Sequence, residues 1–309
     1  MKKRYFLILI LFVFSIFGCK NKSDDKLHIV TTIFPIYDFV REIKTDDFEV
    51  SMLLRPGQEV HTYDPSAKDI TNIYESELFI YVGGESDSYV DTILKNNKNV
   101  KALKLIDFVD TLEEEDDHDH DHDEIEYDEH IWTSVRNAIK MVKAISDSML
   151  EIKNDEQIVT NTNEYISKLE ALDLKFSEIV NNAKTNIMVF GDRFPFLYFA
   201  HDYNLECYKA FPGCSTETEA SAKKIKELVD VCRSNNLKYI YYIDLSNQNV
   251  AKAVAKDANV LMLLFHSVQN VTLDEFKTET YLSLMENNAI ALEKGLNNEW
   301  YFNFLWKFM

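Results

Sequence analysis

Short apolar runs alternate with amphipathic segments over most of the chain. In the first part, strand-like runs at 27–32, 48–54, 78–82 and 100–103 are separated by stretches with helical spacing at 36–43, 66–74 and 89–95. Continuous apolar runs bounded by turn residues are typical of strands that are buried on both faces, as in parallel sheets covered by helices. The pattern therefore predicts an α/β fold with mainly parallel sheets.

The middle of the chain has no strand signal between residue 134 and about residue 184. Ser134 is expected to cap a first helix, and Asn154 or Asp155 a second one, with apolar residues at helical spacing after each. A second helix of about 28 residues would be about 42 Å long at 1.5 Å per residue. We expect it to be a rigid connection between two β/α blocks.

The alternation resumes after this helical region. Strands are expected at 187–190, 206–210, 239–243 and 260–265, and helices at 194–203, 218–234, 250–258 and 273–296. The predicted organisation is an N-terminal lobe at 27–153 with an acidic loop at 113–129, a linking helix at 154–185 and a C-terminal lobe at 186–309. Aromatic residues at alternate positions from Trp300 onward predict a terminal strand or extended arm packed on the body.

Residues 1–18 have the features of a signal peptide. Three basic residues precede a largely apolar run that ends at Phe17, and this run is too short to cross a bilayer, which needs about 20 residues. Cys19 follows a small residue, as in a bacterial lipobox, so we expect it to carry a lipid, with 19–26 as a tether. The alternative is an ordinary cleaved signal. Either way the mature chain is predicted to be extracytoplasmic, and with the lipid it is anchored to the bacterial cell membrane.

The formal charge of −19 disfavours nucleic acid and anionic lipid surfaces as partners and suits a cationic ligand. No glycine-rich phosphate-binding motif is present, so a nucleotide site is not expected. Besides Cys19, the chain has Cys207, Cys214 and Cys232. A disulfide between Cys207 and Cys214 and a set of three separate thiols both remain open.

Three of the eight histidines alternate with aspartates inside the acidic loop, namely His118, His120 and His122. This segment has too little apolar surface to fold alone. We expect it to capture metal weakly and exchangeably. The alternative is a solvated acidic loop without a role.

Three other histidines, His61, His130 and His266, each follow a strand or loop and precede a helix. Ligands in open α/β sheets bind beyond the carboxyl ends of the strands, so convergence of these side chains would create a metal site between the lobes. Three unrelated buried histidines are the alternative.

Several motifs occur in the order of a known family. The chain reads GQEVHTY at 57–63, DEHIW at 128–132 and FHS at 265–267. It resembles the zinc- and manganese-specific class of ABC-transporter solute-binding lipoproteins over essentially its whole mature length. The class has motifs of the form G-x-D-P-H-x-Y, D-P-H-I-W and F-x-D-S, so Val60 and Glu129 stand where proline is usual and His266 stands where a carboxylate is usual.

The resemblance implies two β/α lobes joined by a long rigid helix, with the metal in the cleft between them. It implies metal capture outside the cytoplasm and delivery to a cognate ABC permease and its ATPase. It further implies a monomer held at the membrane by the lipid on Cys19, and no enzymatic activity.

The third ligand motif departs from the class. Where the class has histidine or glutamate, this chain has Arg193, which cannot donate a lone pair. The neighbouring Asp192 is the expected fourth ligand beside the three histidines, and Asp244, another acid or water are the alternatives. Glu59, Asp128, Arg193 and Asp244 are expected to surround and orient the ligands.

Three neutral imidazoles favour Zn²⁺, whereas carboxylate-rich sites suit Mn²⁺. We therefore expect zinc, and manganese is the less favoured cargo. A zinc-dependent hydrolase with a three-histidine site is the alternative of another class. The chain contains no H-E-x-x-H motif, which counts against it.

Overall fold

The computed structural model describes residues 26–113, 127–213 and 219–298. Several predicted features lie outside these ranges: the signal peptide at 1–18, Cys19 and most of the tether, the histidines of the acidic loop, Cys214, and the aromatic segment from Trp300. Among the described helices, none combines the length and the apolar character needed to cross a bilayer.

The first half of the chain alternates strands and helices before two long helices. Its elements are β1 (Leu27–Thr31), α2 (Phe34–Ile43), β2 (Phe48–Met52), α3 (Ala67–Glu75), β3 (Leu78–Tyr81), α4 (Tyr89–Asn96), β4 (Ala102–Lys104), α5 (Val135–Ile152) and α6 (Glu156–Asn181). The second half contains β5 (Ile187–Phe194), α7 (Leu197–Asp202), β6 (Glu206–Pro212), α8 (Ala222–Ser234), β7 (Tyr239–Tyr242), α9 (Asn249–Ala258), β8 (Leu261–Leu264), α10 (Glu275–Thr278) and α11 (Tyr281–Asn297).

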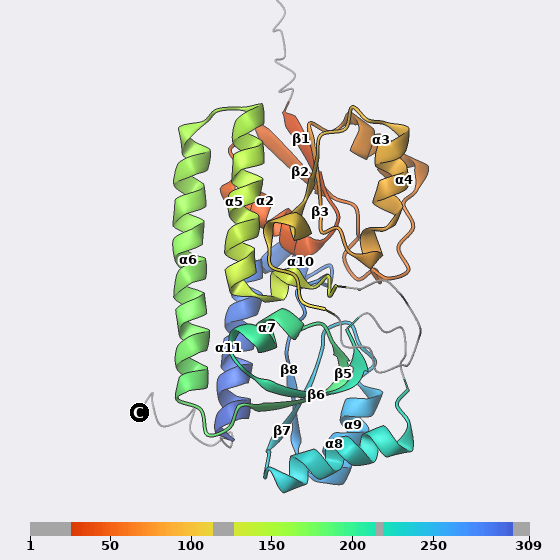
Figure 1. The fold of residues 1–309 in the computed structure, drawn as a ribbon, viewed down its shortest axis with the longest axis vertical. Coiled ribbons are helices and arrows are strands. Elements are labelled where there is room, and N and C mark those ends of the chain that lie inside the picture. Colours follow the sequence, from red (N-terminus) through yellow and green to blue (C-terminus); the bar gives the residue numbers. More distant parts are fainter. Residues whose placement is uncertain (1–25, 114–126, 214–218, 299–309) are drawn as a thin grey trace, which may run out of the picture.

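The strands form two four-stranded sheets, with the orders β2-β1-β3-β4 and β6-β5-β7-β8. Every strand pair within them is parallel; in the first sheet, for example, Val30 lies opposite both Ser51 and Phe79. Parallel neighbours need crossover connections, and helices supply most of them and cover the sheets (Figure 1). The predicted fold class, two β/α lobes with parallel sheets, is confirmed.

The long helix α6 runs along one side of the molecule past both sheets (Figure 1). It packs against α5, α2 and α11, so it contacts helices of both lobes. The predicted caps are present: Ser134 accepts a hydrogen bond from the Asn137 N–H at the start of α5, and Asp155 accepts one from the Gln157 N–H at the start of α6. These caps fix where both helices begin.

Two predicted helices differ in the structure. The helix expected at 273–296 is divided into α10 and α11, because Thr280 caps α11 in a reciprocal pair of hydrogen bonds with Ser283. The Tyr281 N–H donates to buried Asp38 Oδ2 on α2, at 2.6 Å, which ties this break to the first lobe. The helix expected from 194 begins only at Leu197, because β5 continues to Phe194.

One apolar core extends across both lobes and includes Trp132 and Tyr281 among its largest buried side chains. Hydrogen bonds cross the junction beside it. Trp132 Nε1 donates to the Ser267 carbonyl at 2.9 Å, and the Tyr281 hydroxyl donates to the Trp132 carbonyl at 2.8 Å. The segment around Trp132, which follows His130, is therefore held by the second lobe.

Candidate metal site

His61 lies in the irregular segment that follows β2, and the second lobe holds the turn before it. Asn270 Nδ2 donates to the Arg55 carbonyl at 2.9 Å and to the Gln58 carbonyl at 2.7 Å. The Gly57 N–H donates to the Val271 carbonyl at 2.8 Å, and Gly57 has a φ of +80°, a conformation that favours glycine. The position of the His61 loop thus depends on a loop more than 200 residues further along the chain.

His130 immediately precedes the short 3-10 helix η3 (Ile131–Thr133) and is fully buried. Its backbone N–H donates to Asp128 Oδ1 at 2.7 Å, and its ring Nδ1 lies 3.1 Å from the same oxygen. A proton on Nδ1 in this contact orients the ring and leaves Nε2 as the nitrogen with a lone pair for a metal. Asp128 therefore contacts His130 in the structure, and its role in orienting a metal ligand stays a prediction.

Glu129 is buried beside both histidines, and Ser86 holds its carboxylate. The Ser86 N–H donates to Glu129 Oε2 at 2.8 Å, and the Ser86 hydroxyl donates to Oε1. Ser86 Oγ also lies 3.0 Å from His61 Nδ1. Gly84 makes room for this arrangement, because a Cβ there would lie 2.2 Å from the Glu129 Cβ.

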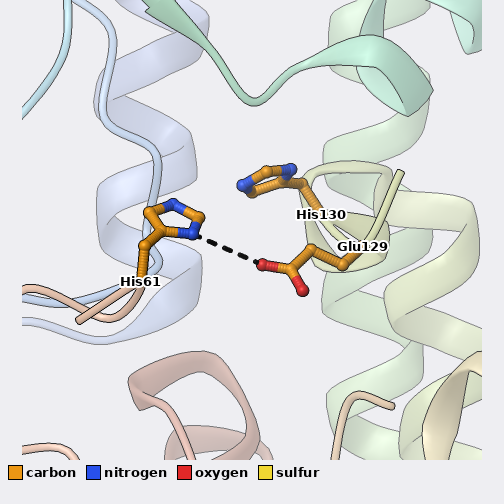
Figure 2. Close-up of side chains that lie close together, drawn as sticks. All are labelled: His61, Glu129 and His130. Atoms are coloured by element: carbon orange, nitrogen blue, oxygen red, sulfur yellow. Dashed lines mark ion pairs between the residues drawn. The ribbon is translucent and has the colours of Figure 1, made fainter. Parts of the chain in front are cut away.

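His61, Glu129 and His130 form a cluster in which one candidate ligand atom from each residue lies within 4.8 Å of the others. Figure 2 shows the three side chains pointing toward one another, with His61 and the other two on separate loops. His61 Nδ1 is 3.9 Å from Glu129 Oε1, and the two imidazole centroids are 6.2 Å apart. The spacing suits three donors around one ion.

The electrostatics of the cluster favour the neutral form of the His61 imidazole. Burial lowers the pKa of His61, and the proximity of His130 lowers it further because two adjacent imidazolium groups would repel each other. Neutral imidazole is the form that binds metal. At neutral pH, His61 is therefore in the form that can bind a cation.

His266 is buried but lies outside this cluster. Its Nδ1 accepts the Val268 N–H at 2.9 Å and is 3.3 Å from Asp244 Oδ1, while its Nε2 is 3.7 Å from Glu275 Oε1. Burial lowers the pKa of His266, but the two carboxylates outweigh this effect and the pKa is raised overall. Nδ1 therefore has a hydrogen-bond partner in its own loop, whereas Nε2 has only the ion-pair contact with Glu275 and no hydrogen bond to a described residue.

Asp192 and Arg193, at the end of β5, also lie outside the cluster. Asp192 is buried, and its Oδ1 accepts the Arg193 N–H at 3.0 Å. Arg193 Nη1 reaches across to Glu59 Oε1 at 3.4 Å, and so links the two lobes next to His61. Burial alone would raise the pKa of Glu59, but Arg193 and His61 outweigh it and lower that pKa.

Sequence reasoning identified His61 and His130 but treated Glu129 only as a departure from a proline position. The available signal was an acidic side chain directly beside a predicted ligand. Ser86, which holds Glu129, had no signal in the sequence, because it lies 43 residues away in the short 3-10 helix η1 (Glu85–Asp87). Cys207 lies in β6 and Cys214 outside the described residues, so both alternatives, a disulfide between them and separate thiols, stay open.

The fold and the cluster define a two-lobed α/β protein in which candidate metal ligands of the first lobe face the second. His130 meets the second lobe directly, since a Cβ on Gly213 at the end of β6 would lie 3.1 Å from its Cε1. Residues 29–295 match the family model described as "Zinc-uptake complex component A periplasmic". The chain belongs to this ZnuA family.

Named relatives agree with this assignment. The chain is 34% identical over 312 residues to the zinc-binding lipoprotein AdcA of Streptococcus pneumoniae serotype 4, covering 97% of this chain and 62% of AdcA. It is 30% identical over 290 residues to the high-affinity zinc uptake system protein ZnuA of Bacillus subtilis, covering 90% of each. It thus spans about three fifths of the length of AdcA and nearly the full length of the Bacillus protein.

A solved structure gives the same result. The crystal structure of the Zn(II)-bound ZnuA-like domain of Streptococcus pneumoniae AdcA matches with a TM-score of 0.73 at 30% identity. The match covers 88% of this chain and 99% of that domain. The fold of this chain is therefore that of the ZnuA-like domain.

Proposed function

We propose that this protein captures Zn²⁺ outside the cytoplasm, with His61, Glu129 and His130 as its protein ligands. The observation that carries this proposal is the convergence of these three side chains from two separate loops. Two imidazoles and a carboxylate are donors that zinc accepts, and three protein ligands leave a fourth position open for exchange. An exchangeable position suits a cargo that must be released.

Zinc is favoured over manganese by the two imidazoles and by the names of the relatives, which are zinc-binding or zinc-uptake proteins. We propose that the protein delivers zinc to an ABC permease with its ATPase, and that a lipid on Cys19 keeps it at the membrane. The name of AdcA as a lipoprotein supports the anchor. Weak capture by His118, His120 and His122 remains part of the proposal.

The ligand set proposed from the structure differs from the set expected from sequence. For His266 to bind the same ion, its ring would have to leave Asp244 and Glu275 and reach the cluster. We propose instead that His266 stabilises the loop that carries Asn270, which in turn holds the His61 loop. Asp192 is assigned to the cavity described in the next subsection.

Calorimetric titration of the zinc-free mature chain tests this function. One tight zinc site is expected, together with weaker sites that disappear when the acidic loop is removed. His61→Ala and His130→Ala should each abolish the tight site, whereas His201→Ala, a change of an exposed histidine, should leave it intact. Retention of tight binding in both site variants would refute the assigned ligands.

A further inference from the structure

A cavity of about 320 Å³ lies beside the His61 loop, between the two lobes. Glu59 and Thr62 line it from the first lobe, and residues 191–193 and 245–247 line it from the second. Residues 191–193 belong to the last part of β5, and residues 245–247 follow β7. The sheet order β6-β5-β7-β8 places successive crossovers on opposite sides of β5, so the cavity lies at the topological switch point, where α/β sheets bind ligands.

A β-bulge directs two successive side chains of β5 into this cavity. Phe190 pairs with Lys209 and Arg193 pairs with Phe211, so three steps along β5 match two along β6. Successive side chains of a regular strand point to opposite faces, but a bulge re-aims them. Asp192 and Arg193 consequently line the same cavity.

The two side chains are incompletely satisfied. Asp192 is 8% exposed, and burial raises its pKa although Ser246 and the Ile243 N–H lie near enough to lower it. Its Oδ2 still has no hydrogen bond of good geometry to any described residue. Such a buried, unpaired acceptor is costly unless a donor reaches it. The hydrogen bonds of the Arg193 guanidinium to Glu59 are long, at 3.4–3.5 Å, so a ligand carboxylate can compete for its donors.

We propose that this cavity binds an α-amino acid. The ammonium group of the ligand would bind Asp192, and its carboxylate would bind Arg193. The two opposite charges of the ligand would thus pair with two neighbouring, oppositely charged side chains of the protein. Phe211, Leu245 and Val250 give the cavity an apolar wall for a side chain. The volume lies within the range of about 300–1,000 Å³ that is usual for small-molecule sites.

Other small occupants fit less well. An inorganic anion would pair with Arg193 but leave the buried oxygen of Asp192 unpaired, and a simple cation would face the Arg193 guanidinium. A zwitterion satisfies both. This inference goes beyond the proposed function, and binding of the amino acid itself does not depend on zinc.

The position of the cavity suggests how the two ligands are related. Glu59, which lines the cavity, is two residues before His61 and is paired with Arg193. An amino acid bound here would lie beside the His61 loop. If its side chain or amine also reached the open position of the zinc site, zinc and its chelator would be captured together; this coupling rests on the proposed function.

The first test uses the zinc-free protein and the twenty common amino acids, each added at millimolar concentration in a thermal-shift assay, followed by calorimetry. At least one is expected to bind. The N-acetyl derivative and the decarboxylated amine of that amino acid should each bind at least about tenfold more weakly, because each lacks one of the two charges.

Asp192→Asn and Arg193→Gln are the matching protein variants, with Asp230→Asn and Arg233→Gln on α8 as controls outside the cavity. Asparagine can still accept the Arg193 N–H through its Oδ1, so the strand is expected to keep its fold. Each cavity variant should weaken amino-acid binding at least about tenfold, and neither control should change it.

Zinc titrations of the same variants separate the two proposals. If no amino acid binds to either the zinc-free or the zinc-loaded protein, the inference is overturned and the zinc site is untouched. It is equally overturned if binding persists in both cavity variants. Zinc titration of His61→Ala and His130→Ala, in proteins with an unchanged cavity, tests the proposed function alone.

Discussion

Glu129 stands where proline is usual in the motif, and this single exchange changes the chemistry of the cluster. Proline offers no side-chain donor, whereas the Glu129 carboxylate lies between two histidines and is oriented by Ser86. A carboxyl group adds an oxygen donor to a buried site whose other candidate ligands are imidazoles.

Glu129→Gln should lower zinc affinity by more than about 100-fold. The amide is nearly isosteric but neutral and a poor zinc ligand, so the loss should exceed the 10–100-fold typical of a residue that only orients a ligand. Chelator competition at pH 7.5 measures it, with exposed Glu151→Gln on α5 as the control. An unchanged affinity would remove Glu129 from the ligand set.

Asp128→Asn should have a smaller effect, a loss of about 10–100-fold in zinc affinity. The amide can still accept the His130 N–H, but it holds the His130 ring less firmly and supports its basicity less well than a carboxylate. The same competition assay applies. A loss as large as that of His130→Ala would mean that Asp128 does more than orient the ring.

Zinc affinity should be nearly constant between pH 7.5 and about 6.5 and should fall below that range. An unperturbed histidine has a pKa of about 6.5. Because the pKa of His61 is lowered by burial and by His130, protons compete with zinc only at lower pH. Competition titrations from pH 5 to 7.5 test this, and a steep fall already above pH 6.5 would contradict the lowered pKa.

Among the secondary-structure elements, α2 and α11 meet at a buried acid. Asp38 on α2 accepts the N–H of Tyr281 at the start of α11 and forms an ion pair with Arg41. Burial raises the pKa of Asp38 to about 6, although Arg41 opposes the shift. A carboxyl group whose pKa is raised on folding contributes stability below its unfolded pKa and loses it as pH rises through the folded value.

Asp38→Asn should therefore make stability less dependent on pH between about 4 and 7. Relative to this variant, the wild-type protein should gain stability as pH falls from 7 towards 4, by up to about 3 kcal/mol for a shift of about two pKa units. Urea unfolding of both proteins at several pH values measures the difference. Asp91→Asn, an exposed change on α4, is the control, and parallel pH profiles for wild type and Asp38→Asn would refute the shift.

At the scale of the whole molecule, the acidic loop is separable from the body. Its ends meet, because Glu113 and Tyr127 form an antiparallel bridge and the Asp128 N–H donates to the Leu112 carbonyl at 3.0 Å. A short turn can therefore replace residues 114–126 without moving His130. The loop contains the three histidines that we propose for weak capture.

Replacing 114–126 by Gly-Ser should keep the tight zinc site within about threefold while the weaker sites disappear. Calorimetric stoichiometry distinguishes the two classes of site. A control with His118, His120 and His122 changed to asparagine keeps the loop length and should lose the weak sites alone. Disappearance of the tight site in the shortened protein would show that the loop contributes a ligand.

Local patterns in the sequence were sufficient for the fold class and for most elements. The apolar runs gave the parallel strands, and Ser134 and Asp155 marked the starts of α5 and α6, because capping is a local interaction. The break at Thr280 was missed, since the apolar pattern continues through it. Its cap pair with Ser283 is local, but the contact that ties the break to the first lobe comes from Asp38, more than 200 residues earlier.

The candidate site also contains residues that the sequence predicted and residues that only the structure brought out. His61 and His130 were predicted as ligands from motifs with a distinctive local context, and the structure brings the two side chains together. The addition of Glu129 and the exclusion of His266 from the cluster depended on which loops the packed lobes bring together. Sequence thus determined the donor types and the strands they follow. Only the tertiary structure decided which of these donors lie close together. Distances of a few ångströms between remote loops are set by the shared core and not by neighbours along the chain.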